Sequence, residues 1–342
     1  MDDFYQAFEN KFRGDRELIK NRLSVYLHFI QPLKSLYPDS PVIDLGCGRG
    51  EWLELLGEYG GFTPRGVDLS AAMLNNAKVQ GLLVEQQDAL VCLKALPDGS
   101  QSIVSGFHIA EHLEFIELQT LVGEAHRVLK PGGLLILETP NPENIIVGTT
   151  SFYMDPTHLQ PLPPDLLEFL AAYAGFCRVK IIRLQEPYNL DRHGQVTLLN
   201  VLDGVSPDYA VVAQKQADST SLALFDQPFD DDYGLTLSAL ATRFNLEQSS
   251  RAAQADERYQ EISHTNRELA EGHSHLAENY SHLVEQLHRL DESHQGLMRR
   301  LQYLENQTVA ALTREADLLS SKSWRYTQIL RRIANWFRTE DK

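Results

Sequence analysis

The sequence is poor in cysteine, in long apolar runs and in positive charge. Its three cysteines, Cys47, Cys92 and Cys177, form no C-x-x-C pair, which argues against a disulfide framework or a zinc site. No stretch approaches the roughly 18 apolar residues of a membrane-spanning helix. The residues from Met1 onward lack the basic start and apolar run of a signal peptide. We therefore expect a protein of the cytoplasm or of the cytoplasmic face of the inner membrane.

The charge is negative and unevenly distributed. A net charge of −16 over 342 residues argues against general nucleic-acid binding, which depends on a basic surface. Residues 320–342 are the exception, with six Lys or Arg against two Asp or Glu. A basic tail on an acidic chain predicts one localised contact with an anionic partner.

Short apolar segments alternate with helical ones between residues 41 and 213. This alternation predicts an α/β fold with a doubly wound, mostly parallel sheet of seven strands. The expected strands are 41–45, 64–67, 82–85, 102–106, 134–137, 179–184 and 196–202. Residues 1–40 are expected to form a helical cap, and residues 214–245 a linker.

Residues 246–319 carry a heptad repeat. Apolar residues recur every seven positions at Ile262, Leu269, Leu276, Leu283, Leu290, Leu297 and Leu304. The other core column is mixed and includes Asn266, His273, Tyr280 and His294. The pattern predicts a coiled coil that joins a dimer or a trimer, and a single long surface helix is the alternative.

The tail at 320–342 places Trp, Tyr, Ile, Leu and Phe beside arginines. Such a helix suits an anionic membrane surface. A docking helix for a protein partner such as a polysaccharide polymerase is the alternative.

A glycine-rich turn follows the first expected strand, in the run from Val42 to Glu51. Gly46 and Gly48 fit the first two glycines of the G-x-G-x-x-G dinucleotide fingerprint. Glu51 occupies the third position, where its carboxylate would face a pyrophosphate. NAD binding is therefore disfavoured.

Three acidic residues end three successive strands. Asp44, Asp68 and Asp88 each lie at or just after the end of a predicted strand, on the same rim of the sheet. Asp44 can anchor the turn and meet a cationic ligand, Asp68 is placed for ribose hydroxyls, and Asp88 for an adenine amino group. Singly each would be a cap or turn residue, but together they indicate a nucleoside-binding edge.

The motifs Asp44–Gly50, Gly66–Ser70 and Val128–Gly133 resemble those of class I S-adenosylmethionine-dependent methyltransferases, over roughly residues 40–205. The resemblance implies a Rossmann-like methyltransferase domain that binds S-adenosylmethionine. It assigns the ribose to Asp68, the adenine to Asp88 and Ala89, and the methionine portion to residues 46–50. Leu69 and His108 complete the expected lining of the cofactor site.

A narrower resemblance links three segments, 8–20, 106–113 and 138–164, to bacterial O-antigen chain-terminating methyltransferases. Such enzymes cap the terminal sugar of a growing lipid-linked polysaccharide, and coiled coils that set chain length follow their catalytic parts. Some relatives add a kinase and methylate a phosphate, but this sequence has no His-Arg-Asp or Asp-Phe-Gly motif. We therefore expect direct methylation of a sugar hydroxyl, and a separate kinase that acts first stays open.

Histidines are the expected catalytic residues, because their proton equilibrium lies near neutral pH. His158 is expected to be the general base and His112 to position the substrate. A structural histidine is the alternative for each. Asp155 could orient His158 or help to hold a divalent ion, although no metal is assigned. Arg13 and Arg22 could reach the methionine carboxylate, or could be ordinary surface arginines.

Two other functions remain open. One is a methyltransferase for a small molecule or a quinone, with an oligomerising arm. The other is a coiled-coil scaffold whose catalytic head is secondary.

Overall fold

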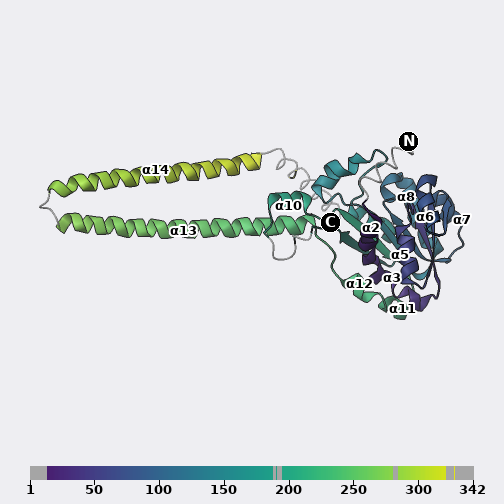
Figure 1. Cartoon of the computed structure of the whole chain (residues 1–342). Helices are drawn as coiled ribbons and strands as arrows, with labels where there is room; N and C mark the ends of the chain where they lie inside the picture. Colours follow the sequence, from purple (N-terminus) through teal and green to yellow (C-terminus); the bar gives the residue numbers. More distant parts are fainter. Residues whose placement is uncertain (1–13, 188–189, 191–194, 280–283, 321–326, 328–342) are drawn as a thin grey trace. The chain divides into compact units, whose positions relative to one another are not determined.

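The computed structural model describes residues 14–187, 190, 195–279, 284–320 and 327. The chain divides into two compact units, residues 1–253 and residues 254–342. The first unit is an α/β domain, and the second contains most of two long helices (Figure 1). Arg13 and most of the tail lie outside the described residues.

The first unit is built on a seven-stranded sheet with the order β3-β2-β1-β4-β5-β7-β6. Its strands are β1 (Ser40–Leu45), β2 (Phe62–Asp68), β3 (Val84–Gln86), β4 (Gln101–Phe107), β5 (Leu129–Pro140), β6 (Arg178–Leu184) and β7 (Asp208–Gln214). The first five are parallel, and β7 runs antiparallel to both β5 and β6. The strand order reverses between β1 and β4, which is where such sheets bind ligands at their carboxyl ends.

Helices cover both faces of this sheet. The helices of the first unit are α2 (Arg16–Leu23), α3 (Leu27–Ile30), α4 (Leu33–Leu36), α5 (Glu51–Tyr59), α6 (Ala71–Val79), α7 (Ala89–Ala95), α8 (Phe115–Val128), α9 (Pro164–Tyr173), α10 (Leu198–Asp203), α11 (Ser219–Ala223), α12 (Asp226–Asp230) and the start of α13 (Leu237–Asn279). The rest of α13 and all of α14 (Val284–Ser320) belong to the second unit. Short turns of helix are η1 (Ser24–Tyr26), η2 (Ala110–His112), η3 (Val147–Ser151) and η4 (Phe152–Met154).

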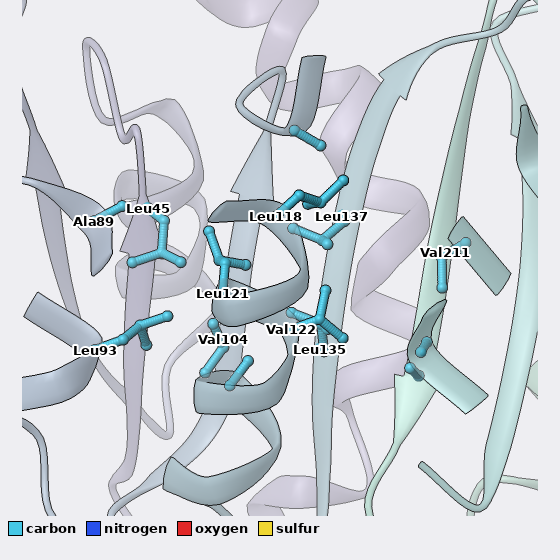
Figure 2. Close-up of a cluster of buried hydrophobic side chains, with 14 of the residues drawn as sticks. Leu45, Ala89, Leu93, Val104, Leu118, Leu121, Val122, Leu135, Leu137 and Val211 are labelled. Atoms are coloured by element: carbon cyan, nitrogen blue, oxygen red, sulfur yellow. The ribbon is translucent and has the colours of Figure 1, made fainter. Parts of the chain in front are cut away.

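Each face has its own apolar core. On one face, Leu121 and Val122 of α8 pack against Val104 of β4 and Leu135 of β5, as Figure 2 shows. On the other face, the predicted N-terminal cap forms α2 to α4 and packs with α5 and α12 over the sheet. The two cores hold the sheet as a rigid base, so residues at its carboxyl edge have well-defined positions.

The expected strand at 196–202 is wrong. Residues from Leu198 to Asp203 form helix α10, and the seventh strand is β7, from Asp208 onward. The helix begins at a capping box in which the side chains of Thr197 and Asn200 each bond the other residue's backbone N–H. Local capping therefore outweighs the β propensity of a short apolar run.

The segment expected as a linker, 214–245, is folded. It forms α11, α12 and the start of α13, and the side chains of Phe225 and Leu240 are fully buried. Arg178 in β6 holds this segment through hydrogen bonds from Nη1 to Leu222 O and Asp226 Oδ1, both 2.9 Å long. The compact unit accordingly extends to Ala253.

In the second unit, the heptad side chains that the structure describes are exposed in the single chain. Ile262 is 59% exposed, Leu297 54% and Leu304 55%. Leu283 and the expected tail helix lie outside the described residues. Within the described part, no helix is both long and apolar enough to span a bilayer. The pairing of these helices in a coiled coil stays a prediction.

Candidate cofactor and acceptor site

The glycine turn lies at the carboxyl end of β1. Gly46, Gly48 and Gly50 have φ values of 66°, 53° and 80°, in the region that side chains other than glycine rarely adopt. Gly50 is the N-cap of α5, so the turn leads directly into a helix N-terminus. A polar group bound above this turn can therefore approach the backbone closely.

Asp68 ties the glycine turn to the end of β2. Its Oδ2 accepts a 2.9 Å hydrogen bond from Gly48 N, and its Oδ1 accepts a 2.7 Å bond from Ser70 N. The side chain is only partly buried, so it also faces the solvent side of the edge. The sequence analysis predicts that Asp68, at this position, binds the ribose hydroxyls of the cofactor.

Asp44 and Asp88 make hydrogen bonds with clear structural roles. Asp44 is 2% exposed, and its Oδ1 accepts a 2.7 Å hydrogen bond from Ser105 in β4. This geometry suits anchoring of the turn better than contact with a cationic ligand. Asp88 caps α7 by accepting a 2.9 Å bond from Val91 N. Cap and ligand roles are compatible for Asp88, because a carboxylate has several acceptor positions.

An adenosyl group fits the remaining residues of this half. Leu69 is 68% exposed directly after Asp68, which leaves an apolar side chain beside the expected ribose. Ala89 is nearly buried next to Asp88. Gln87 Oε1 is buried without a hydrogen-bond partner among the described residues, so this neighbourhood has an acceptor to offer an amino group.

Of the described arginines, Arg16 reaches the turn. Its Nη1 donates a 3.0 Å hydrogen bond to Arg49 O, and its Nε donates a 2.5 Å bond to Glu54. Arg22 is exposed and acts electrostatically on Asp208. The prediction for Arg13 lies outside the described residues. Arg16 lies six residues before Arg22 and directly after Asp15, the residue that caps helix α2. This capping residue is the sequence signal that could have identified Arg16.

A cavity of about 450 Å³ lies at the other half of the edge. Residues from three stretches of the chain, 140–158, 185–187 and 203–208, line it: Pro140, Asn144, Val147, Ser151, Phe152, His158, Gln185, Pro187, Asp203, Pro207 and Asp208. None of these described lining residues is Lys or Arg. The cavity therefore combines apolar walls with uncharged and acidic polar groups.

His158 lines this cavity in a neutral state. Its Nδ1 lies 2.7 Å from Phe152 O, and because a carbonyl only accepts, Nδ1 carries the proton. Burial lowers the pKa of His158, against the opposing charge of Glu111. Nε2 is thus unprotonated near neutral pH and can take up a proton or a cation.

His112 lies beside His158, as the sequence predicts for two residues of one site. The ring centroids are 4.7 Å apart at an interplanar angle of 69°. His112 Nδ1 lies 3.0 Å from Thr157 Oγ1 and 3.3 Å from Thr157 O. Asp155 accepts bonds from Thr157 N and Oγ1, so it orients the residue that holds His112.

His108 belongs to a cluster of buried acids that the sequence analysis missed. Its φ of 57° is strained for a residue other than glycine, and its Nδ1 lies 3.1 Å from Glu111 Oε1. Nε2 lies 3.6 Å from Glu138 and 4.0 Å from Asp208. Burial works to lower the pKa of His108, but its bonds with Glu111 and Glu138 prevail and raise it well above the usual value. The side chain is therefore an imidazolium held by carboxylates on one side, with 43% of its surface still exposed.

Asp208 joins this cluster to the cavity. Burial raises the pKa of Asp208 to about 6, although the charge of His108 opposes the shift. Tyr26, from the N-terminal cap, donates a hydrogen bond to Glu138, and Gln185 donates another over 3.4 Å. Only long-range folding brings these residues together, and no short motif marks them.

The comparisons with known proteins agree with this geometry. A model described as a methyltransferase domain matches residues 16–180. A crystal structure of an S-adenosylmethionine-dependent methyltransferase from Archaeoglobus fulgidus is 33% identical, with a TM-score of 0.55, and the match covers 62% of this chain and 100% of that one. The chain belongs to the class I S-adenosylmethionine-dependent methyltransferases.

Curated relatives of this methyltransferase match it over part of their length. A probable S-adenosylmethionine-dependent methyltransferase from Mycolicibacterium smegmatis is 29% identical over 135 residues, which cover 40% of this chain and 51% of the relative. A protein of the same description from Mycobacterium tuberculosis is 29% identical over 215 residues, which cover 59% of this chain and 76% of the relative. The cofactor is S-adenosylmethionine, and the resemblance on which the sequence analysis rests is confirmed at that level.

Proposed function

We propose that this enzyme transfers a methyl group to a hydroxyl of the terminal non-reducing sugar of a lipid-linked O-antigen polysaccharide, and so ends chain growth. The lining of the cavity beside His158 carries the proposal. Gln185, Asp203 and Asp208 offer acceptors for sugar hydroxyls, and Gln185 Oε1 is buried without a partner in the described part of the chain. Phe152 and three prolines offer apolar walls for the C–H face of a sugar ring.

A neutral acceptor suits this cavity better than a phosphorylated one. Phosphate sites generally contain arginine, lysine or clustered backbone N–H groups. The described lining instead includes two carboxylates, Asp203 and Asp208, which repel an anion. Residues 188–189 and 191–194, which follow Pro187, lie outside the described part of the chain. The experiment below therefore includes a phosphorylated acceptor.

The chemistry needs a positioned hydroxyl and a place for its proton. S-adenosylmethionine supplies an electrophilic methyl group as a sulfonium. His158 activates the hydroxyl through its unprotonated Nε2, in the simplest case by accepting the proton directly. His112, packed on the ring of His158, helps to position the substrate. Apolar walls line part of the cavity, and positioning of the acceptor supplies much of the acceleration.

The long helices supply the proposed control of chain length. The heptad residues Ile262, Leu297 and Leu304 are about half exposed in a single chain, which is costly for large apolar side chains in water. Pairing with the same column of a second or third copy would bury them as coiled-coil core positions. Sedimentation of the full chain and of residues 1–253 tests this: an unchanged oligomeric state after truncation would contradict it.

The basic tail completes the proposal. Its six Lys or Arg with interspersed aromatic residues suit the anionic cytoplasmic face of the inner membrane, and a polysaccharide polymerase could dock on the same region. Flotation of the full chain with liposomes that contain anionic lipid, against the chain ending at residue 319, tests the membrane contact. Equal flotation of the two forms would remove it.

A second candidate acceptor is a small aromatic molecule. A 2-methyl-6-phytyl-1,4-hydroquinone methyltransferase from Synechocystis is 25% identical over 176 residues, which cover 48% of this chain and 54% of that protein. The apolar walls of the cavity are compatible with such a ring. This alternative predicts that the long helices are dispensable for the natural reaction.

One experiment separates these acceptors. The full-length enzyme is incubated with S-adenosylmethionine labelled in the methyl group and with four acceptors. They are an oligosaccharide with a free non-reducing end, the same glycan phosphorylated there, the same glycan already O-methylated, and a hydroquinone. We expect label on the free glycan and none on the capped one, with the position read by linkage analysis. Label on the hydroquinone alone would overturn the proposal.

A further inference from the structure

Three potential metal ligands converge beside the acceptor cavity. Glu111 and His112 lie on η2, and His158 lies in the loop that follows η4. One ligand atom from each residue lies within 4.8 Å of the other two. Two imidazoles and a carboxylate form a mixed donor set of the kind that binds divalent first-row transition metals.

Each of the three side chains is oriented by an outer partner. The Nδ1 atoms of His158 and His112 face the backbone carbonyls of Phe152 and Thr157, at 2.7 and 3.3 Å. Their protons therefore lie on Nδ1, and Nε2 is the nitrogen left for an ion. Protein metal sites commonly use this arrangement, because the outer hydrogen bond fixes both the tautomer and the ring orientation.

Glu111 is held as firmly. It is fully buried, its Oε2 accepts a 2.9 Å hydrogen bond from Thr139 Oγ1, and its Oε1 lies 3.1 Å from His108 Nδ1. A buried carboxylate with two outer partners keeps its position whether or not an ion is bound. Its remaining acceptor positions are available on the side of the two imidazoles.

The spacing fits an ion better than a hydrogen bond. His158 Nε2 lies 4.0 Å from Glu111 Oε1 and 3.8 Å from Asp155 Oδ2, which is longer than a hydrogen bond. Ligands about 2.1 Å from a common ion are separated by roughly 3 to 4 Å. The three ligand atoms lie within 4.8 Å of one another, so closure by up to about 1 Å would bring the set into coordination.

A second cluster, His108 with Glu138 and Asp208, is a weaker candidate. Both ring nitrogens of His108 already face carboxylates, at 3.1 Å from Glu111 and 3.6 Å from Glu138. Tyr26 and Gln185 donate to the same Glu138 carboxylate. That cluster satisfies its own charges, whereas the imidazoles of His112 and His158 each keep a ring nitrogen facing Glu111.

We propose that Glu111, His112 and His158 bind one divalent transition-metal ion whose open positions face the cavity lined by His158. The role of the ion in catalysis rests on the proposed function, but its binding does not. In that reaction the acceptor hydroxyl oxygen binds the ion, which makes the hydroxyl more acidic. Its proton leaves to water, the oxygen forms a bond to the methyl carbon, and the carbon–sulfur bond breaks with its electron pair on sulfur. His158 then acts as a ligand rather than as a base.

Metal binding itself is the test. The full-length protein is stripped with a chelator, dialysed, and titrated with Mn²⁺ or Zn²⁺ by calorimetry, with Mn²⁺ also followed by electron paramagnetic resonance. We expect one ion per chain. Glu111→Gln and His158→Gln should each weaken binding at least 100-fold. His126→Gln is the matched control, because His126 packs against Phe176 outside the cluster.

Binding of S-adenosylhomocysteine reports that each variant remains folded. No stoichiometric binding, or equal binding by all variants, would overturn the inference. Binding lost in Asp208→Asn but kept in His158→Gln would assign the ion to the other cluster and also overturn it. Metal-independent methylation of a glycan would refute the catalytic role of the ion and leave the proposed function standing. Tight binding of the ion without methylation of a glycan would support the metal site and contradict the proposed function.

Discussion

The two halves of the sheet's carboxyl edge are built differently. In the cofactor half, at β1, β2 and β3, Asp68 bonds residues 20 and 2 positions away in the chain. In the acceptor half, at β4, β5 and β7, Tyr26 bonds Glu138 over a separation of 112 residues, and Asn141 bonds Ser206 over 65. Short-range contacts leave a readable motif, whereas long-range contacts leave scattered polar residues. Changes in one half should therefore have little effect on the chemistry of the other.

The largest expected effect is in the cofactor half. Asp68→Ala removes the acceptor for Gly48 N and the proposed partner of the ribose hydroxyls. Two charge-assisted hydrogen bonds are lost, so we expect affinity for S-adenosylhomocysteine to fall about 100-fold or more, as measured by calorimetry. Asp203→Asn, in the acceptor half, should keep the wild-type affinity. Similar losses in both variants would show that the halves are coupled.

Two strand glycines compare the packing of the halves. A Cβ at Gly66 would lie 2.6 Å from both Cβ and Sγ of Cys47, whereas one at Gly106 would lie 2.7 Å from Cγ2 of Ile109. The Cβ of Cys47 moves only with its backbone, but Ile109 can change rotamer. We expect Gly66→Ala to lower the free energy of unfolding by about 3 kcal/mol and Gly106→Ala by about 1 kcal/mol. Urea denaturation measures both, and the reverse order would refute the packing argument.

Titration of Asp208 distinguishes the acceptor half. Burial raises its pKa in the fold to about 6, from the ordinary value of 3.8 for an aspartate. Between these two values the folded state binds more protons than the unfolded state, so this group's contribution to stability is present below pH 3.8 and lost as the pH rises through 6. Asp208→Asn should be more stable than wild type above that pH by up to about 3 kcal/mol, and equal to it at low pH. Chemical denaturation at several pH values checks this, and a constant difference would contradict it.

The smallest expected effect concerns the arginines of the N-terminal cap. Arg16 bonds Arg49 O and Glu54, and its side chain is 24% exposed. Arg16→Met should therefore lower the free energy of unfolding by about 1 kcal/mol. Arg22→Met, at an exposed position, should change it by less than about 0.5 kcal/mol. Equal effects would show that contact with the glycine turn does not stabilise the cap.

Local sequence predicts most of the cofactor half because the information there is local. Glycines at positive φ and an acidic residue at the end of β2 are required by the turn itself. The same locality misleads at residues 196–202, where β propensity indicates a strand but Thr197 and Asn200 cap helix α10. The segment 214–245 looks polar enough for a linker, yet it buries Phe225 and Leu240. Burial of a few apolar residues is invisible to average composition.

The sequence by itself determined the alternation of strands and helices, the glycine turn with Asp68, and the candidate histidines His112 and His158. Hydrophobic period and turn geometry act over a few residues, so they can be read without the fold. Only the tertiary structure decided that Glu111 lies between His108 and His158, and that Asp208 joins Glu138 at the cavity. Those positions depend on strand order and on how two helical layers pack, and these are properties of the whole sheet.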